Sequence, residues 1–216
     1  MAKKNRDKDM KSRRRKGRGT RSTSEPILLF VQGECTEKDY FELLKSRLRL
    51  QSLTIRDESK SPETLINQTK TTISREKDAP FSAIYYVVDV DETSDEQFRQ
   101  AFKAAKDATN RKTEYHFVVS HESFEAWLLA HFEDIRNKNI PRKTMGKRLQ
   151  GRKMLNGKRV SNNFPVEDYK QAMGQVTHCA LDEVNRETTS TAMPHLITEL
   201  IKLKPKTQPN RATCST

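Results

Sequence analysis

Residues 84–91 read IYYVVDVD, and this stretch decides which fold the sequence favours. Five apolar or aromatic residues run without interruption and end at Asp89 and Asp91, with Val90 between them. An unbroken apolar run of this length is typical of a strand that is buried on both faces, as in the middle of a parallel sheet. Residues two apart on a strand share a face, so both carboxylates are expected to face a crevice at the carboxyl end of the sheet.

Two interpretations of this acidic pair remain open. Like charges so close together repel, and a divalent cation with oxygen ligands, Mg²⁺ or Mn²⁺, would relieve the repulsion. Alternatively, Asp89 and Asp91 are solvated turn residues that cap a helix beginning near Ser94.

The preceding segments alternate between strand and helix patterns. Residues 27–31 (ILLFV) predict a strand, Gly33 supplies the bend after it, and Thr36 is expected to cap a helix that runs to about residue 50. Glu34 and Glu37 lie in this turn. Further along, the patterns predict a weak strand at 53–55, a helix from 62 to about 77, the central strand at 82–88, a helix at 95–108 and a strand at 115–120. This alternation predicts an α/β fold with a mainly parallel sheet flanked by helices.

The last third of the chain is less regular. Residues 123–132 predict a helix with Glu125 in its first turn, where this carboxylate either joins the acidic site or serves only the helix dipole. Residues 133–161 break every periodic pattern and are expected to form a long basic loop or insertion. Residues 164–186 and 191–203 are expected to be helical. The expected organisation is a disordered basic arm at 1–24, an α/β core at 25–132, the basic insertion at 133–161, and C-terminal helices at 162–204 that complete the same domain.

The net charge of +12 on 216 residues is unevenly distributed. Residues 1–24 hold 11 Lys and Arg against two Asp, and residues 134–160 hold 10 against one, so each segment carries +9 and the remainder carries −6. This pattern indicates that basic segments bind nucleic acid while an acidic site holds a metal. A basic arm can also be plain solubilising disorder. The candidate phosphate-binding residues are Arg13, Arg14, Arg15, Lys143, Lys147 and Arg148.

The residue types point to one chemistry and exclude others. Carboxylates on neighbouring turns, beside basic segments, suit metal-assisted phosphoryl transfer, in which Lys143, Lys147 or Lys170 would stabilise the transition-state charge. The sequence has no phosphate-binding Gly-Lys-Ser loop, no dinucleotide glycine fingerprint and no zinc-ligand spacing. No apolar run approaches the roughly 18 residues that span a membrane. Three cysteines without a pairing pattern, and no hydrophobic leader, favour a cytoplasmic protein.

Four ordered motifs resemble those of RloB-like proteins, the group that includes the second component of the AbiL abortive-infection system. They are ILLFVQGECTEKDYF at 27–41, VVDVDE at 87–92, SHESFEAWLLAHFE at 120–133 and TTSTAMPHLITEL at 188–200. The resemblance covers about residues 26–203. It implies a Toprim-like α/β domain and a role in bacterial defence against phage, often beside a partner ATPase of the ABC or AAA type encoded nearby.

The resemblance also implies a metal-dependent nuclease acting on DNA or RNA with Mg²⁺ or Mn²⁺. Glu34, Asp89 and Asp91 are the expected metal ligands, and Glu37 and Glu125 occupy the family's other acidic positions. Gln32 stands where the family has glutamate before glycine. Either Glu34 substitutes for that glutamate, or the chain is a weak or inactive nuclease that still binds nucleic acid or a partner. A third hypothesis is a toxin kept silent in an ATPase complex. The sequence indicates no oligomeric state.

Overall fold

The computed structural model describes residues 25–33, 35–58, 61–62, 64–67, 69, 81–90 and 93–205. The expected basic arm at 1–24, with Arg13, Arg14 and Arg15, lies outside the described residues, and so do Glu34 and Asp91. Of the helix expected from residue 62 to about 77, residues 62, 64–67 and 69 are described and are helical.

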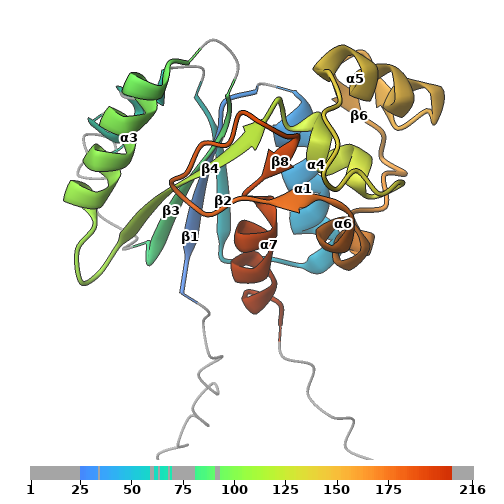
Figure 1. Cartoon of the computed structure of the whole chain (residues 1–216). Coiled ribbons are helices and arrows are strands. Elements are labelled where there is room, and N and C mark those ends of the chain that lie inside the picture. Colours follow the sequence, from blue (N-terminus) through green and yellow to red (C-terminus); the bar gives the residue numbers. More distant parts are fainter. Residues whose placement is uncertain are drawn as a thin grey trace, which may run out of the picture.

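A mostly parallel sheet forms the centre of the protein (Figure 1). Its described strands are β1 (Ile27–Val31), β2 (Leu53–Asp57), β3 (Ala83–Asp89), β4 (Glu114–His121), β7 (Thr177–His178) and β8 (Ser190–Thr191). They lie in the order β2-β1-β3-β4-β8-β7. The first four are parallel to one another, whereas β8 is antiparallel to β4 and parallel to β7. All seven residues of β3 are buried, as its unbroken apolar run predicted, and the predicted α/β fold class is confirmed.

Helices cover both faces of the sheet (Figure 1). One apolar cluster contains side chains of α1 (Thr36–Leu48), α4 (Glu125–Ala130), α5 (Arg142–Gly151), α6 (Tyr169–Gln175) and α7 (Met193–Lys202). On the other face, α3 (Asp95–Ala108) packs with residues 65 and 66. Strand β1 shows why two clusters form: Leu29 belongs to the first and Leu28 to the second, because alternate strand residues point to opposite faces.

Local sequence signals set several helix boundaries. Ser94 caps α3 through a capping box with Gln97, so the helix predicted at 95–108 is confirmed. The expected cap of α1 is wrong: Cys35 occupies the N-cap position and Thr36 is the first helical residue. The Thr36 hydroxyl instead donates to the Lys158 carbonyl oxygen, 2.8 Å away. The Thr36 hydroxyl, which the sequence predicted would cap the helix, therefore binds a segment far away in the sequence instead.

The segment at 133–161, expected to be a long basic loop or insertion, is largely structured. It contains α5 and a small hairpin of β5 (Leu155–Asn156) and β6 (Arg159–Val160). Met145 and Leu149 are fully buried, which anchors α5 on the core. The helix went unpredicted because only these two apolar residues mark its buried face among basic and glycine residues. In the described part of the chain, no helix is long and apolar enough to cross a membrane.

The helix expected at 164–186 is also wrong over much of its length. A 3-10 turn, η1 (Val166–Asp168), leads into α6, which ends at Gln175. The chain then becomes extended because β7 pairs with β8, and residues 179–189 are not helical. Helix α7 lies within the predicted range of 191–203.

Candidate acidic site

Asp89 is the last residue of β3, and its side chain is held in a buried position at the carboxyl edge of the sheet. Its Oδ1 accepts a hydrogen bond of 2.9 Å from the backbone N–H of Phe124, just before α4. Its own backbone N–H donates to Gln32 Oε1 at 3.4 Å. Gln32 directly follows β1, which pairs with β3. The residue that departs from the family pattern therefore lies beside Asp89.

Glu37 reaches this region from the first turn of α1. It is buried, and its carboxylate lies over Gly33: a Cβ atom at position 33 would be 1.7 Å from Glu37 Oε2. Burial raises the pKa of Glu37, a hydrogen bond from its own backbone lowers it, and the negative charge of Glu125 raises it again. The missing side chain at Gly33 thus makes room for an acidic group close to Glu125.

Arg142 forms ion pairs with both Asp89 and Glu125. Its Nη2 lies 3.8 Å from Asp89 Oδ2, and its Nε lies 3.8 Å from Glu125 Oε2. Arg142 is the first residue of α5, and its backbone N–H donates to Glu122 Oε2 at 2.7 Å. Sequence reasoning missed this residue because it resembled one of many cations in an expected loop. The Pro141-Arg142 step was the available signal, since proline is favoured where helices begin.

The electrostatics of the site follow from this convergence. Burial raises the pKa of Asp89 well above its ordinary value, and the charges of Glu37 and Glu125 raise it further. The Arg142 guanidinium and the hydrogen bond from Phe124 act in the opposite direction. Two carboxylates from separate helices therefore repel the strand-end carboxylate. Such a cluster favours a bound positive charge.

The donor chemistry suits a hard divalent cation, because carboxylate oxygens are the ligands that Mg²⁺ and Mn²⁺ prefer. Within the described residues, however, no group of three His, Cys, Asp or Glu side chains is arranged to hold a metal ion. Of the three expected ligands, only Asp89 is described. The expected convergence with Glu34 and Asp91 stays a prediction.

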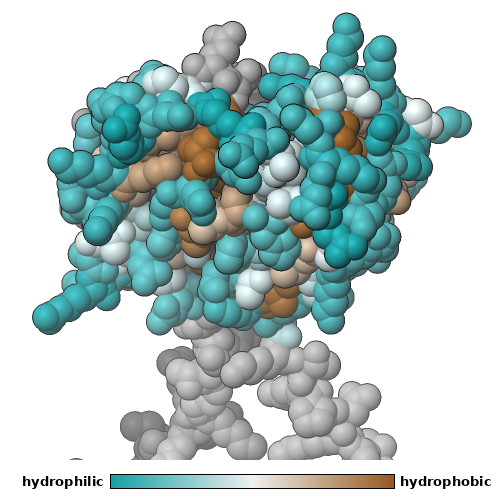
Figure 2. Space-filling model, viewed as in Figure 1, coloured by the Kyte–Doolittle hydropathy of each residue, from teal (hydrophilic) through white to brown (hydrophobic). Residues whose placement is uncertain are grey.

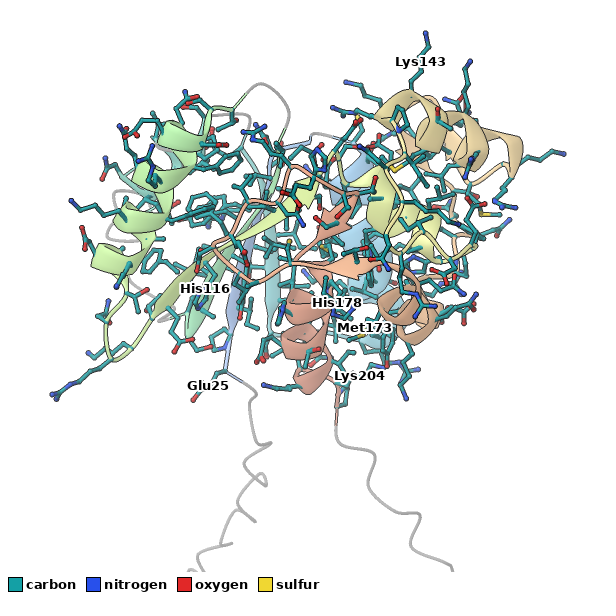
Figure 3. The ribbon with its side chains drawn as sticks, in the orientation of Figure 1. Glu25, His116, Lys143, Met173, His178 and Lys204 are labelled. Atoms are coloured by element: carbon teal, nitrogen blue, oxygen red, sulfur yellow. The ribbon has the colours of Figure 1, made fainter. Side chains whose placement is uncertain are left out.

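Basic groups flank the carboxylates. The β5–β6 hairpin docks on the first turn of α1, where Asp39 accepts from Arg159 Nη1 at 2.8 Å and from the Val160 backbone at 3.2 Å. This docking places Lys158 close enough to lower the pKa of Glu37. Lys143 on α5 is exposed and projects from the top of the molecule (Figure 3). Hydrophilic side chains dominate the face of the molecule seen in this orientation (Figure 2).

The other basic candidates on α5 differ in their surroundings. Lys147 is exposed on α5. Arg148 Nη1 instead pairs with Glu133 Oε1 at 2.5 Å, and Arg152 Nη2 pairs with Glu133 Oε2 at 2.7 Å. Arg148 therefore helps to fasten α5 to the segment that follows α4, in addition to any contact with phosphate.

Lys170 lies on α6. It is exposed on α6, next to Tyr169, whose hydroxyl accepts from Lys204 Nζ at 3.0 Å. Lys204 is at the opposite end of the molecule from Lys143 (Figure 3). The described cations that act on the carboxylates are Arg142 and Lys158. Helix α6, which carries Lys170, packs against η1, α4 and α7, so the role of Lys170 at the carboxylates stays a prediction.

Beneath the site, His131 lies in a buried aromatic cluster. Its Nδ1 is 3.0 Å from the Trp127 carbonyl oxygen, so Nδ1 carries the proton and donates it. Its Nε2 can then accept from the Tyr40 hydroxyl at 3.5 Å. Burial lowers the pKa of His131 to about 4. This histidine is therefore a neutral packing residue at physiological pH.

These features define a mixed α/β protein with a buried acidic site at the carboxyl edge of its parallel strands. A family model described as RloB-like protein matches residues 27–200, and the chain belongs to this family. The match spans the four motifs that carried the resemblance. No curated protein and no solved structure matches the chain.

Proposed function

We propose that this RloB-like protein is a metal-dependent nuclease of the Toprim-like type that cleaves DNA or RNA in bacterial defence against phage. The observation that supports the proposal is Asp89, a buried carboxylate at the end of β3 whose pKa is raised by burial and by Glu37 and Glu125. Structural roles alone rarely gather buried, mutually repelling carboxylates at the edge of a parallel sheet, where α/β proteins bind ligands. Lys143 and Lys147 are exposed on α5, the helix that begins at Arg142.

Asp89, with Glu34 and Asp91, would hold the cation. Bound Mg²⁺ or Mn²⁺ would supply an activated water and neutralise charge on the cleaved phosphodiester. The Phe124 N–H fixes Asp89 Oδ1, which leaves Oδ2 to face the charged groups of the site.

Two other groups of residues would assist. Glu37 and Glu125 would position or deprotonate the attacking water from the flanking helices. Lys143 and Lys147 would bind phosphates along the strand. A partner ATPase of the ABC or AAA type, encoded nearby, belongs to the same proposal.

A second candidate function is a binding module without cleavage activity. Gln32 favours it, because its neutral amide lies beside the backbone of Asp89, where the family places a glutamate. Such a protein would bind nucleic acid through its basic segments with an affinity that falls steeply with salt. That affinity would be unchanged by EDTA or by loss of the Asp89 charge.

The test is cleavage of plasmid DNA and tRNA in Mg²⁺ or Mn²⁺, with and without the partner ATPase. Asp89→Asn keeps the shape of the side chain and the acceptor for Phe124 N–H but removes the charge. Asp107→Asn, on the exposed surface of α3, is the matched control. The nuclease proposal requires cleavage that is lost with EDTA and with Asp89→Asn but kept in the control. Binding without cleavage under every condition would favour the second function.

A further inference from the structure

The β5–β6 hairpin ends in a tight turn. Its last paired residues are Asn156 and Arg159, so Gly157 and Lys158 form a two-residue connection. Gly157 has a φ of 62°, in the left-handed region, whereas the φ of Lys158 is not positive. Glycine with positive φ at the first of two turn residues is typical of a type II′ hairpin. The local sequence therefore places Lys158 at the tip of the hairpin.

Helix α1 holds this tip from its first turn. The Thr36 hydroxyl donates to the Lys158 carbonyl oxygen at 2.8 Å, and Asp39 accepts from Arg159 Nη1 at 2.8 Å. Glu37 lies between Thr36 and Asp39 in the same helical turn. The backbone of the tip is thus fastened to the turn that carries a buried carboxylate of the acidic site.

The side chain of Lys158 is left to solvent. Lys158 is exposed, and within the described part of the chain its ammonium group has no hydrogen-bond or ion-pair partner. Burial raises the pKa of Glu37, and the positive charge of Lys158 acts in the opposite direction, so the ammonium group lies within electrostatic reach of this carboxylate. A fixed backbone therefore carries an unpaired cation beside the acidic site.

A nucleic acid needs such a cation to approach these carboxylates. Asp89, Glu37 and Glu125 would repel its phosphates, and an exposed positive charge beside them offsets that repulsion. Lysine binds phosphate as a point charge and reads no sequence. Because the hairpin fixes the backbone of Lys158 before a ligand arrives, binding orders little more than one side chain.

We propose that Lys158 binds a backbone phosphate of the nucleic-acid substrate next to Glu37. The type II′ turn and the contacts from Thr36 and Asp39 hold it in that place. The inference rests on the nucleic-acid binding of the proposed function and involves no metal ion. None of the residues that the sequence predicted to contact phosphate lies on this hairpin, so Lys158 adds a contact at the acidic site itself.

The test measures binding of the full chain to a fluorescent DNA duplex by anisotropy, over a range of salt concentrations in EDTA, with a fluorescent tRNA in parallel. Lys158→Met should lower the slope of log affinity against log salt by about 0.9 and weaken DNA binding roughly eightfold at about 0.1 M salt. Lys158→Arg keeps the charge and should bind like wild type. Lys112→Met, the matched control, removes an exposed lysine just before β4, at the amino end of the parallel strands, and should also bind like wild type.

A second variant tests where the phosphate lies. Glu37→Gln removes a charge that would repel a phosphate bound by Lys158, so at pH 8 it should tighten DNA binding in an otherwise wild-type chain. In the Lys158→Met background the same change should alter affinity less than about twofold, because no phosphate is held beside position 37. Equal tightening in both backgrounds would overturn the placement at the acidic site.

The outcomes separate this inference from the nuclease proposal. If Lys158→Met binds both probes like wild type, the inference is overturned even where wild type cleaves DNA. Weaker binding by Lys158→Met with wild-type binding by the control supports the inference, even if no condition gives cleavage. If wild type binds neither probe, the inference and the proposed function both fail. Circular dichroism checks the fold of each variant, and Lys158→Gln replaces Lys158→Met if the latter is unfolded.

Discussion

Replacing Gly33 with alanine should displace the Glu37 carboxylate without unfolding the protein. The added Cβ would lie 1.7 Å from Glu37 Oε2 and 2.3 Å from Cδ, whereas real Cβ atoms do not approach closer than 3.0 Å. The carboxylate must therefore retreat by about 1.3 Å, the difference between 1.7 and 3.0 Å. The obstacle is the far end of a flexible side chain and not backbone, so Glu37 can yield by changing rotamer.

The expected effects on activity and on stability differ sharply. A displacement of about 1 Å in an active site can reduce the rate about 100-fold. The free energy of unfolding should change by less than about 1 kcal/mol, because alanine suits the backbone and a buried carboxylate moves toward water. Single-turnover cleavage of plasmid DNA in Mn²⁺ measures the first quantity, and urea unfolding followed by circular dichroism measures the second.

A double-mutant cycle tests whether Gly33 acts through Glu37. Glu37→Ala removes the obstructed carboxylate, so adding Gly33→Ala to this variant should change the rate less than about twofold. If Gly33→Ala slows cleavage equally in both backgrounds, it acts by another route and the close approach to Glu37 is not the cause. Wild-type activity in Gly33→Ala would show directly that the position of the Glu37 carboxylate does not matter for cleavage.

Three further predictions concern charge. Because the pKa of Asp89 is raised in the folded state, the protein loses stability as the pH rises through that pKa. Asp89→Asn removes the charge, so it should raise the free energy of unfolding at pH 7 in EDTA by on the order of 1 kcal/mol. At pH 3 it should give no gain. A less stable variant would contradict this. Burial lowers the folded-state pKa of His131 to about 4. The free energy of unfolding should therefore fall by about 3 kcal/mol as the pH drops from 6.5 toward 4. His131→Phe should flatten this part of the pH profile, measured as the midpoint of urea unfolding. Lys143→Gln and Lys147→Gln should each reduce the slope of log affinity for DNA against log salt by about 0.9, measured by fluorescence anisotropy; an unchanged slope would exclude these lysines from phosphate contact.

The strand and helix patterns of the α/β core could be predicted because their signals are local. The apolar run that ends at Asp89 predicted a strand buried on both faces, and β3 has all its residues buried. The Ser94 and Gln97 pair marked the start of α3 in the same way. Each signal depends on residues that are close together in the sequence, and their separation along the chain is the same before and after folding.

The candidate site could be predicted only in part. The sequence identified Asp89, Glu37 and Glu125, because each occupies a recognisable strand-end or helix-start position. Their mutual effects on pKa depend on three segments meeting at one edge. Arg142 could not be singled out, because nothing adjacent to it distinguishes it from the other cations of its segment.

The sequence by itself determined the parallel sheet, the acidic strand end and the membership of the RloB-like family. Only the tertiary structure decided that α5 begins beside that end and that Arg142 faces Asp89. The physical reason is that burial and Coulomb interactions act through space, between segments far apart in the chain. Periodicity can show which face of a segment is buried, but not which distant charge that segment will meet.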